Sequence, residues 1–166
     1  MSEWHIAGWE VLGRIARGST ADVLLARPDL TGEVTPASLS LGLAGIDQRV
    51  ALKRLYPHLA ENEEFVRMFV DEIRLMSLLR HEGIVDVYDL DEDDETFYAV
   101  LELVDGPSLS AALRLHHKQT GSAAVDVAFA AAVVARVCAA LDVVHRAKDN
   151  DGVALELVHR DVNPQN

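Results

Sequence analysis

The stretch that decides the fold of this chain is His159-Arg160-Asp161-Val162-Asn163-Pro164-Gln165-Asn166. It places a carboxylate and three side-chain amides next to a histidine and an arginine. So short a string can agree with a pattern by chance, so it needs support from elsewhere in the sequence. Three upstream strings give that support in a fixed order: Ala16-Arg17-Gly18-Ser19-Thr20-Ala21-Asp22-Val23, Val50-Ala51-Leu52-Lys53 and Leu101-Glu102-Leu103-Val104-Asp105-Gly106.

The first half of the sequence is predicted to form strands and one helix. Short aliphatic or β-branched runs predict strands at Trp9–Ala16, Asp22–Ala26, Arg49–Arg54, Val85–Leu90 and Thr96–Val104. The segment 28–48 is rich in Pro, Gly, Ser and Thr, and we expect a long surface loop there. Apolar residues at three- and four-residue steps predict a helix over Glu61–Leu79, with one face made by Phe65, Phe69, Ile73, Met76 and Leu79.

The second half is predicted to be helical. Leu109–Lys118 is expected to form a short helix, and the alanine-rich segment Ala124–Ala147 a long one. Residues 148–152 predict a turn, and Leu155–Val158 is expected to form a short strand that leads into the 159–166 stretch. The apolar side of the long helix needs partner helices, so we expect much of that side to be exposed in this chain.

The charge of the chain limits its partners. The net charge is −12 at pH 7, which argues against a nucleic-acid backbone or an anionic membrane surface as a partner. The longest apolar run, Val127–Ala135, is far shorter than the roughly 20 residues of a membrane-spanning helix, so no membrane segment is expected. The acidic run Asp89–Glu95 is interpreted as a solvated turn between two strands, in preference to a metal or docking site.

The cysteine content indicates the compartment. The single Cys138 excludes a disulfide framework and is typical of a reducing cytoplasm. It falls within an apolar helical pattern, so we expect a small core residue. The first ten residues lack a cationic stretch followed by an apolar one, and no signal peptide is expected. The sequence therefore predicts a soluble cytoplasmic protein.

The order of these elements, ending in the 159–166 stretch, resembles the protein kinase fold, and most closely the eukaryotic-like serine/threonine kinases of bacteria. The resemblance implies an α+β fold: a small lobe with a five-stranded antiparallel sheet and one helix, followed by an incomplete helical large lobe. Residues 1–8 would form an N-terminal tail, 9–104 the small lobe and hinge with the inserted loop 28–48, and 105–166 the truncated start of the large lobe. The implied cofactors are ATP and Mg²⁺.

The resemblance also implies how the small lobe holds phosphate. Lys53 would bind the α- and β-phosphates of ATP, and Glu72 on the following helix would pair with Lys53 and aim it. The family's phosphate-binding loop carries three glycines. Only Gly18 remains here, because Ala16 and Ala21 stand in place of the other two. Glycines serve in such loops because they let backbone N–H groups approach phosphates closely.

A second implied set of residues would bind the adenine ring. Its apolar walls would have few polar groups, and Leu101 would act as the gatekeeper residue. Glu102 would offer its backbone carbonyl, and Val104 its N–H and carbonyl. The side chains that would cover the ring are Ile15, Val23 and Ala51.

In the 159–166 stretch, the resemblance implies catalytic roles. Asp161 would accept the proton of a substrate hydroxyl, and Asn166 would ligate Mg²⁺. Asn163 stands where serine/threonine kinases usually carry a lysine that contacts the γ-phosphate. His159 would be structural and pack beneath the loop. The implied substrate is a protein with a serine or threonine hydroxyl.

The family's D-F-G segment, activation loop and remaining large-lobe helices do not appear in this sequence. We therefore expect a serine/threonine kinase by family, truncated and inactive by itself, that requires a chain supplying the missing large lobe. The alternative is a non-catalytic kinase-like module that docks on a partner. Replacing Lys53 separates these hypotheses, because only an enzyme depends on it.

Overall fold

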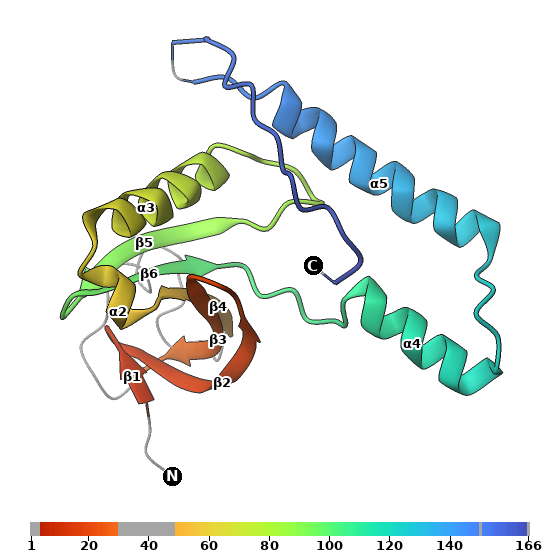
Figure 1. Ribbon diagram of the computed structural model, residues 1–166, viewed down its shortest axis with the longest axis horizontal. Coiled ribbons are helices and arrows are strands. Elements are labelled where there is room, and N and C mark those ends of the chain that lie inside the picture. The colour runs from red at the N-terminus through yellow and green to blue at the C-terminus, as the bar shows by residue number, and fades with distance from the viewer. Residues whose placement is uncertain (1–3, 30–48, 150, 166) are drawn as a thin grey trace. The chain divides into compact units, whose positions relative to one another are not determined.

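The computed structural model describes residues 4–29, 49–149 and 151–165 (Figure 1). The loop expected at 28–48 therefore lies almost entirely outside the described residues. Asn166, expected to ligate Mg²⁺, also lies outside them.

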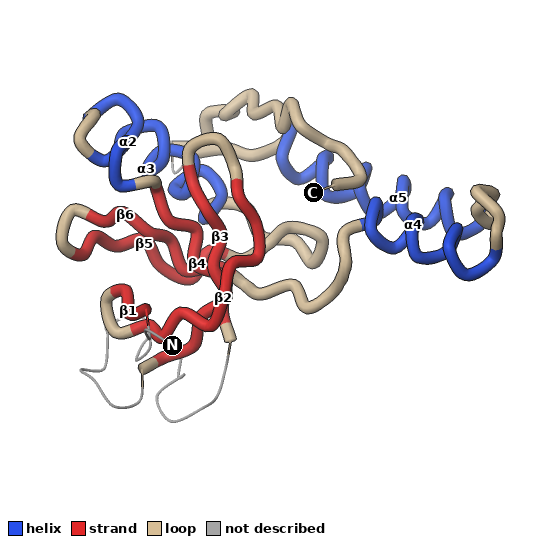
Figure 2. Tube along the Cα trace, turned by 60° about the horizontal axis from the view of Figure 1, so that its bottom comes forward, coloured by secondary structure: helices blue, strands red, loops and turns tan. Residues whose placement is uncertain are grey.

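The chain divides into two compact units, one built mainly from strands and one from helices (Figure 2). The first consists of Met1–Leu78 with Val85–Leu103, and the second of Leu79–Ile84 with Val104–Asn166. The expected α+β fold with a strand-rich small lobe and a partial helical lobe is confirmed, but the expected number of five strands is wrong, because Trp4–Ile6 adds a sixth strand. In the described part of the chain the sheet has six strands, in the order β1-β2-β3-β4-β6-β5, and every neighbouring pair is antiparallel.

The elements of the first unit are β1 (Trp4–Ile6), β2 (Trp9–Arg17), β3 (Ala21–Pro28), β4 (Val50–Leu55), α2 (Pro57–Ala60), α3 (Glu63–Ser77), β5 (Val87–Asp93) and β6 (Thr96–Leu101). Strand β1 falls in the segment expected to be a tail, and it pairs with β2. The acidic run is mostly strand: β5 includes its first five residues, and only Asp94 and Glu95 form the turn, both with positive φ.

Two apolar cores lie on opposite faces of the sheet, and β3 contributes to both. Successive side chains of a strand point to opposite faces, so Leu24 and Ala26 enter one core while Ala21 and Val23 enter the other. The inner core consists of Ile6, Trp9, Leu24, Ala26, Val50, Leu52, Tyr98 and Val100. The helix-side core consists of Ala21, Ala51, Leu55, Phe69, Ile73, Val87, Ala99 and Leu101.

The sheet curls so that its two edge strands approach each other at one end. Strands β1 and β5 lie at opposite ends of the strand order. Even so, the Ala7 N–H, in the turn after β1, donates a hydrogen bond to Asp93 Oδ2 at the end of β5, at 3.0 Å. Ile6 of β1 also shares the inner core with Tyr98 of β6. The inner core is therefore enclosed by the concave face of a single curled sheet.

Helix α3 packs against β5 (Figure 1). It carries the predicted apolar stripe. Asn62 caps its start by accepting the Glu64 N–H at 2.9 Å. Phe69 and Ile73 are buried in the helix-side core, and Met76 is partly buried against it. The helix predicted over 61–79 is confirmed, although it is two residues shorter at each end.

The second unit contains α4 (Leu109–Thr120) and α5 (Val127–His145). Ser108 and Asp126 cap their starts, and α4 ends at Gly121, whose φ of 71° is the left-handed conformation that glycine adopts without strain. No residue of α5 is buried, as expected for a helix without partners along its apolar side. Cys138 is exposed, so the expectation of a core cysteine is wrong for this chain.

Helix α5 bears on the expectation that no segment spans a membrane. It has 19 residues and a mean hydropathy of 2.2, so its length and composition alone would allow it to cross a bilayer. That expectation was based on the length of the uninterrupted apolar run and did not consider the length of the whole helix. One such helix is weak evidence for a span, because the core helix of a soluble protein passes the same test.

The short strand expected at Leu155–Val158 is wrong. The only β-bridge in the described part of this segment joins Lys148 to Ala154, and no ladder continues from it. Glu156 has a φ of 51°. A residue in the left-handed region interrupts an extended strand, and this conformation is not evident from the residue type.

Candidate functional site

Lys53 and Glu72 meet across the sheet and helix of the first unit. The Lys53 Nζ lies 2.7 Å from Glu72 Oε1. Lys53 projects from β4 beside Val23 of β3 and Ala99 of β6. Its ammonium also lies 5.8 Å from the centre of the Phe69 ring, one helical turn before Glu72. The Lys53 side chain is 20% exposed and that of Glu72 is 53% exposed, so the lysine is held at a partly covered position by a solvated carboxylate.

Of the residues expected to surround adenine, three are buried or partly buried in the first unit and one is exposed. Ala51 and Leu101 are cross-strand partners in β4 and β6, and both are buried. Val23 is partly buried against the same core. Ile15 is exposed, because it lies at a register shift in β2 between Arg14 and Ala16, where an extra residue bulges from the ladder.

The expected hinge residues are exposed or half-buried. The Glu102 N–H donates to the Asp86 carbonyl at 2.9 Å, and Glu102 Oε2 accepts the Asp86 N–H at 3.2 Å. These two bonds tie Glu102 to the segment before β5. Val104, the first residue of the second unit's longer segment, is 65% exposed, and its carbonyl accepts the Gly106 N–H at 3.1 Å.

The β2–β3 hairpin carries the string with one surviving glycine. The Gly18 N–H donates to the Ala21 carbonyl at 2.8 Å and closes the tip. A Cβ added to Gly18 would lie 3.1 Å from that same carbonyl oxygen, which is tighter than ordinary contact. The tip is therefore a compact backbone turn that favours glycine at position 18.

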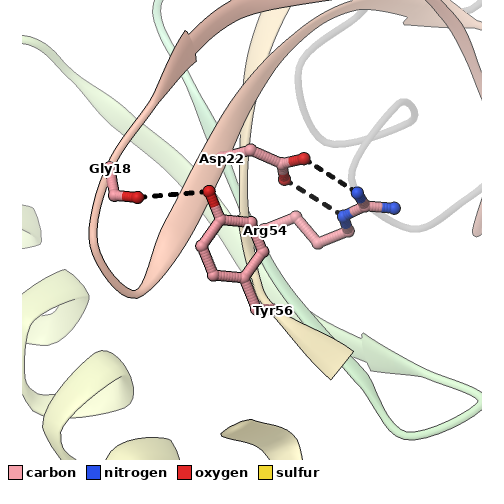
Figure 3. Close-up of polar contacts among 4 residues, drawn as sticks. All are labelled: Gly18, Asp22, Arg54 and Tyr56. Atoms are coloured by element: carbon pink, nitrogen blue, oxygen red, sulfur yellow. Dashed lines mark hydrogen bonds and ion pairs between the residues drawn. The ribbon is translucent and has the colours of Figure 1, made fainter. Parts of the chain in front are cut away.

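An ion pair fixes strand β3 to β4 directly beside the hairpin tip, where Asp22 pairs with Arg17. Arg54 Nε and Nη2 donate to the two carboxylate oxygens of Asp22 at 3.1 and 2.8 Å (Figure 3). The Asp22 side chain is only 5% exposed and that of Arg54 17%. A buried bidentate pair of this kind restricts both strands, because breaking it would leave a buried charge.

The 159–166 stretch lies in the second unit and is joined to α4 by the Ser110 N–H, which donates to the Pro164 carbonyl at 2.6 Å. Asn163 Nδ2 donates to Asp161 Oδ1 at 2.8 Å, and Asn163 Oδ1 accepts the Gln165 N–H at 2.8 Å. Asn163 therefore orients the Asp161 carboxylate, and its own side chain is fixed by the hydrogen bond from the Gln165 N–H.

His159 does not pack beneath this loop as expected. It is exposed, and its Nδ1 accepts the Asp161 N–H at 3.2 Å. This local hydrogen bond orients the histidine along its own loop, where it supports the backbone of Asp161.

Comparison with known proteins identifies the family. The family model described as "Protein kinase domain" matches residues 38–166, more than half of the chain. The chain belongs to the protein kinase family. The match includes β4 with Lys53, α3 and the whole 159–166 stretch, and it begins after the hairpin that carries Gly18.

Similar kinases are bacterial. The chain is 31% identical over 153 residues to tyrosine-protein kinase MasK of Myxococcus xanthus, covering 92% of this chain and 22% of that kinase. It is 34% identical over 159 residues to serine/threonine-protein kinase PksC of Streptomyces coelicolor, covering 93% of this chain and 27% of that kinase. The chain therefore spans about a quarter of the length of these relatives.

A solved kinase domain has the same fold. The crystal structure of the PknI kinase domain of Mycobacterium tuberculosis matches with a TM-score of 0.66 and 28% identity, covering all of this chain and 56% of that one. These findings support a eukaryotic-like bacterial kinase, as the sequence predicted.

The described residues of this kinase fit a nucleotide in several respects. Lys53 supplies a cation at a partly covered position, and Gly18 has no side chain at the hairpin tip. Ala51, two residues before Lys53 on β4, is a small apolar residue. Among the described residues, no group of three or more His, Cys, Asp or Glu side chains is arranged to hold a metal ion. The predicted Mg²⁺ ligand, Asn166, lies outside those residues.

Sequence reasoning missed two features of this kinase. The Asp22–Arg54 pair was not predicted, although a charged residue alternating with apolar ones in each of two neighbouring strands could have indicated it. Tyr56, which contacts the hairpin tip, was also missed. Its position before Pro57 predicts an extended backbone but not the hairpin that folds back onto it.

Proposed function

We propose that this chain carries the ATP-binding lobe and the catalytic loop of a serine/threonine protein kinase, which transfers phosphate from ATP to a protein hydroxyl. The observation that carries the proposal is the 2.7 Å ion pair between Lys53 and Glu72. A partly buried lysine in the middle of a sheet costs free energy unless its charge is paired. The partner carboxylate on a separate helix directs the ammonium without covering it.

The small-lobe residues have separate tasks in this proposal. ATP supplies the transferred phosphoryl group, and Mg²⁺ neutralises phosphate charge. Lys53 binds the phosphates as a compact cation, and Glu72 holds its side chain in place. Ala51 and Leu101, paired across β4 and β6, offer an apolar floor for a flat aromatic ring, and Val23 extends it.

The catalytic loop positions a base. Asp161 accepts the proton of the substrate hydroxyl, and Asn163 orients its carboxylate through the 2.8 Å hydrogen bond to Oδ1. Because Asn163 is neutral, this loop holds its base without adding the positive charge that a lysine would bring. We infer that Asn163 substitutes for the positioning task of a lysine but not for its electrostatic one, so phosphoryl transfer is slower than with a lysine.

Substrate class and setting are part of the proposal. Relatives named as serine/threonine kinases favour a serine or threonine hydroxyl, whereas MasK is named a tyrosine-protein kinase. Phosphoamino-acid analysis of the products, formed with the rest of the large lobe supplied, decides between them, and phosphotyrosine alone would overturn the proposal. We further propose that this chain acts in the cytoplasm, is inactive by itself and needs a chain segment that supplies the rest of the large lobe.

Nucleotide binding by variants of Lys53 tests the proposal. Calorimetric titration with Mg–ATP should give affinity roughly tenfold or more weaker for Lys53→Met, because a charge-assisted contact is lost. Lys118→Met is the matched control, since Lys118 is an exposed lysine in the last turn of α4. Equal affinities for the parent chain and both variants would reject the nucleotide site.

The competing function is a non-catalytic module that docks on a partner. It predicts that Lys53→Met leaves every measurable property unchanged except a small change in stability. The near-solvent Glu72 makes that change about 1 kcal/mol or less. A large loss of nucleotide affinity with almost no loss of stability therefore favours the kinase proposal.

A further inference from the structure

Tyr56 contacts the hairpin tip at three points. Its hydroxyl donates to the Gly18 carbonyl at 3.2 Å (Figure 3). Its N–H donates to the Thr20 carbonyl at 3.0 Å. The Arg17 guanidinium lies over the Tyr56 ring, 5.8 Å from its centre. Tyr56, the residue after strand β4, thus bonds to Gly18 and Thr20, the residues on both sides of Ser19.

Tyr56 is itself held in place. It follows buried Leu55 at the end of β4 and precedes Pro57, which begins α2. A residue before proline is restricted to extended backbone, and Tyr56 has φ −64° and ψ 136°. Its carbonyl accepts the Leu59 N–H at 2.8 Å, and its ring stacks on that of His58, with centroids 5.6 Å apart. We call Tyr56 with its contacts to the hairpin tip the clamp. The clamp is therefore anchored to the sheet through β4 and to the start of helix α2.

The hydroxyl bond sets the direction of a peptide plane. A trans peptide is planar, with its C=O and N–H pointing in opposite directions, and the described chain contains no cis bond. When the Gly18 carbonyl points to the Tyr56 hydroxyl, the Ser19 N–H of the same peptide points away from it. Tyr56 therefore fixes the direction of a donor at the centre of the tip.

We propose that Tyr56 is a positioning residue for nucleotide binding: its hydroxyl holds the Gly18–Ser19 peptide so that the Ser19 N–H is directed toward a phosphate. This inference rests on the proposed function, because it assigns the phosphate to the nucleotide bound near Lys53. Backbone N–H groups that converge on a concave turn are a general means of binding anions. Orienting the peptide before binding lowers the entropy lost when the anion arrives.

The need for such a clamp follows from the hairpin itself. Gly18 is the tip's one glycine, and it has no side chain to restrict its backbone. The Asp22–Arg54 pair fixes β3 to β4 directly beside the tip, but these two bonds do not involve the Gly18 carbonyl. Of the contacts that Tyr56 makes, the N–H bond to Thr20 continues the pairing of β3 with β4, as any residue could. The hydroxyl bond requires tyrosine.

Tyr56→Phe removes that hydroxyl and keeps the ring and the backbone bond. Tyr98→Phe is the matched control, because it removes another hydroxyl bond of the same lobe, from Tyr98 to Asp91 at 3.3 Å. Two quantities are measured on the parent chain and both variants: the NMR order parameter of the Ser19 amide without nucleotide, and the dissociation constant for Mg–ADP by titration.

The expected result is a lower Ser19 order parameter and a dissociation constant roughly two- to tenfold higher for Tyr56→Phe, the range given by losing one neutral hydrogen bond. Tyr98→Phe should match the parent in both. Unchanged Ser19 order and unchanged affinity in Tyr56→Phe would overturn the clamp. A loosened Ser19 with unchanged affinity would overturn its role in binding. If the parent binds no Mg–ADP while Tyr56→Phe still loosens Ser19, the proposed nucleotide site fails and the restraint on the hairpin stands.

Discussion

Replacing Arg54 by methionine should destabilise the first unit far more than an ordinary surface change. Both carboxylate oxygens of Asp22 accept from Arg54, at 3.1 and 2.8 Å, and the Asp22 side chain is 5% exposed. Water cannot readily replace donors at so covered a carboxylate. Removing one partner of a buried pair typically costs about 3–5 kcal/mol, because the remaining charge is left without compensation.

The opposite single change should cost less. In Asp22→Val the charge left behind is the Arg54 guanidinium, whose side chain is 17% exposed and lies on a flexible stem that can turn toward water. Valine also suits a strand position. We expect a loss of about 1–3 kcal/mol for Asp22→Val. The double variant Asp22→Val/Arg54→Met has no buried charge at this place and should be more stable than Arg54→Met alone.

Urea unfolding followed by tryptophan fluorescence measures these differences, because Trp9 is fully buried in the inner core. For Arg54→Met the midpoint should fall by more than about 1 M urea. A loss below about 1 kcal/mol, or a double variant no more stable than Arg54→Met, would refute the reasoning. Either result would mean that the two charges are solvated in the folded chain.

Three further predictions concern the same unit. Gly18→Ala should lower stability by about 1 kcal/mol in urea unfolding, because the new Cβ meets the Ala21 carbonyl at 3.1 Å and must displace backbone; an unchanged midpoint would show that the tip adjusts freely. Asp93→Ala should lower the melting temperature, since losing the acceptor for the Ala7 N–H costs about 0.5–1.5 kcal/mol; equal melting of parent and variant would mean that the edges are held by apolar contacts alone. Burial, with help from neighbouring carboxylates, raises the pKa of Tyr98 well above its usual 10.0. The stability that this shift contributes is complete below pH 10 and is lost as pH rises above that value. Above pH 10 the urea midpoint of the parent should therefore fall more steeply than that of Tyr98→Phe, and parallel curves would contradict the assignment.

Much of the fold could be predicted from the sequence because it depends on local patterns. The apolar stripe placed the helix that carries Glu72, and alternation placed the strand that carries Lys53, so the structure brings together two residues that the sequence had already singled out. Strand β1 has only three residues, Trp4–Ile6, too few to show alternation, and was expected to be a tail. Helix α2 was also missed, although Pro57 at its first position is a known start of helices.

The rest depends on contacts between distant residues or on backbone conformation. The sequence showed that Asn163 lacks the charge of a lysine, but not that its amide would bond to Asp161. It gave no indication that Glu156 would adopt a positive φ and end the expected strand. Cys138 was expected in a core because its helix is apolar. The apolar pattern shows which helix face would be buried by a partner segment. Whether such a segment packs there cannot be read from the helix itself.

The acidic residues of β5 protect the sheet from other chains. Strand β5 is an edge of the sheet, and an edge strand presents unpaired backbone groups to which a strand of another molecule can bind. Asp91, Glu92 and Asp93 are exposed along this edge. Two molecules meeting edge to edge would bring these carboxylates together, and their repulsion opposes strand pairing. Salt screens such repulsion, so this kinase lobe should self-associate more readily as ionic strength rises.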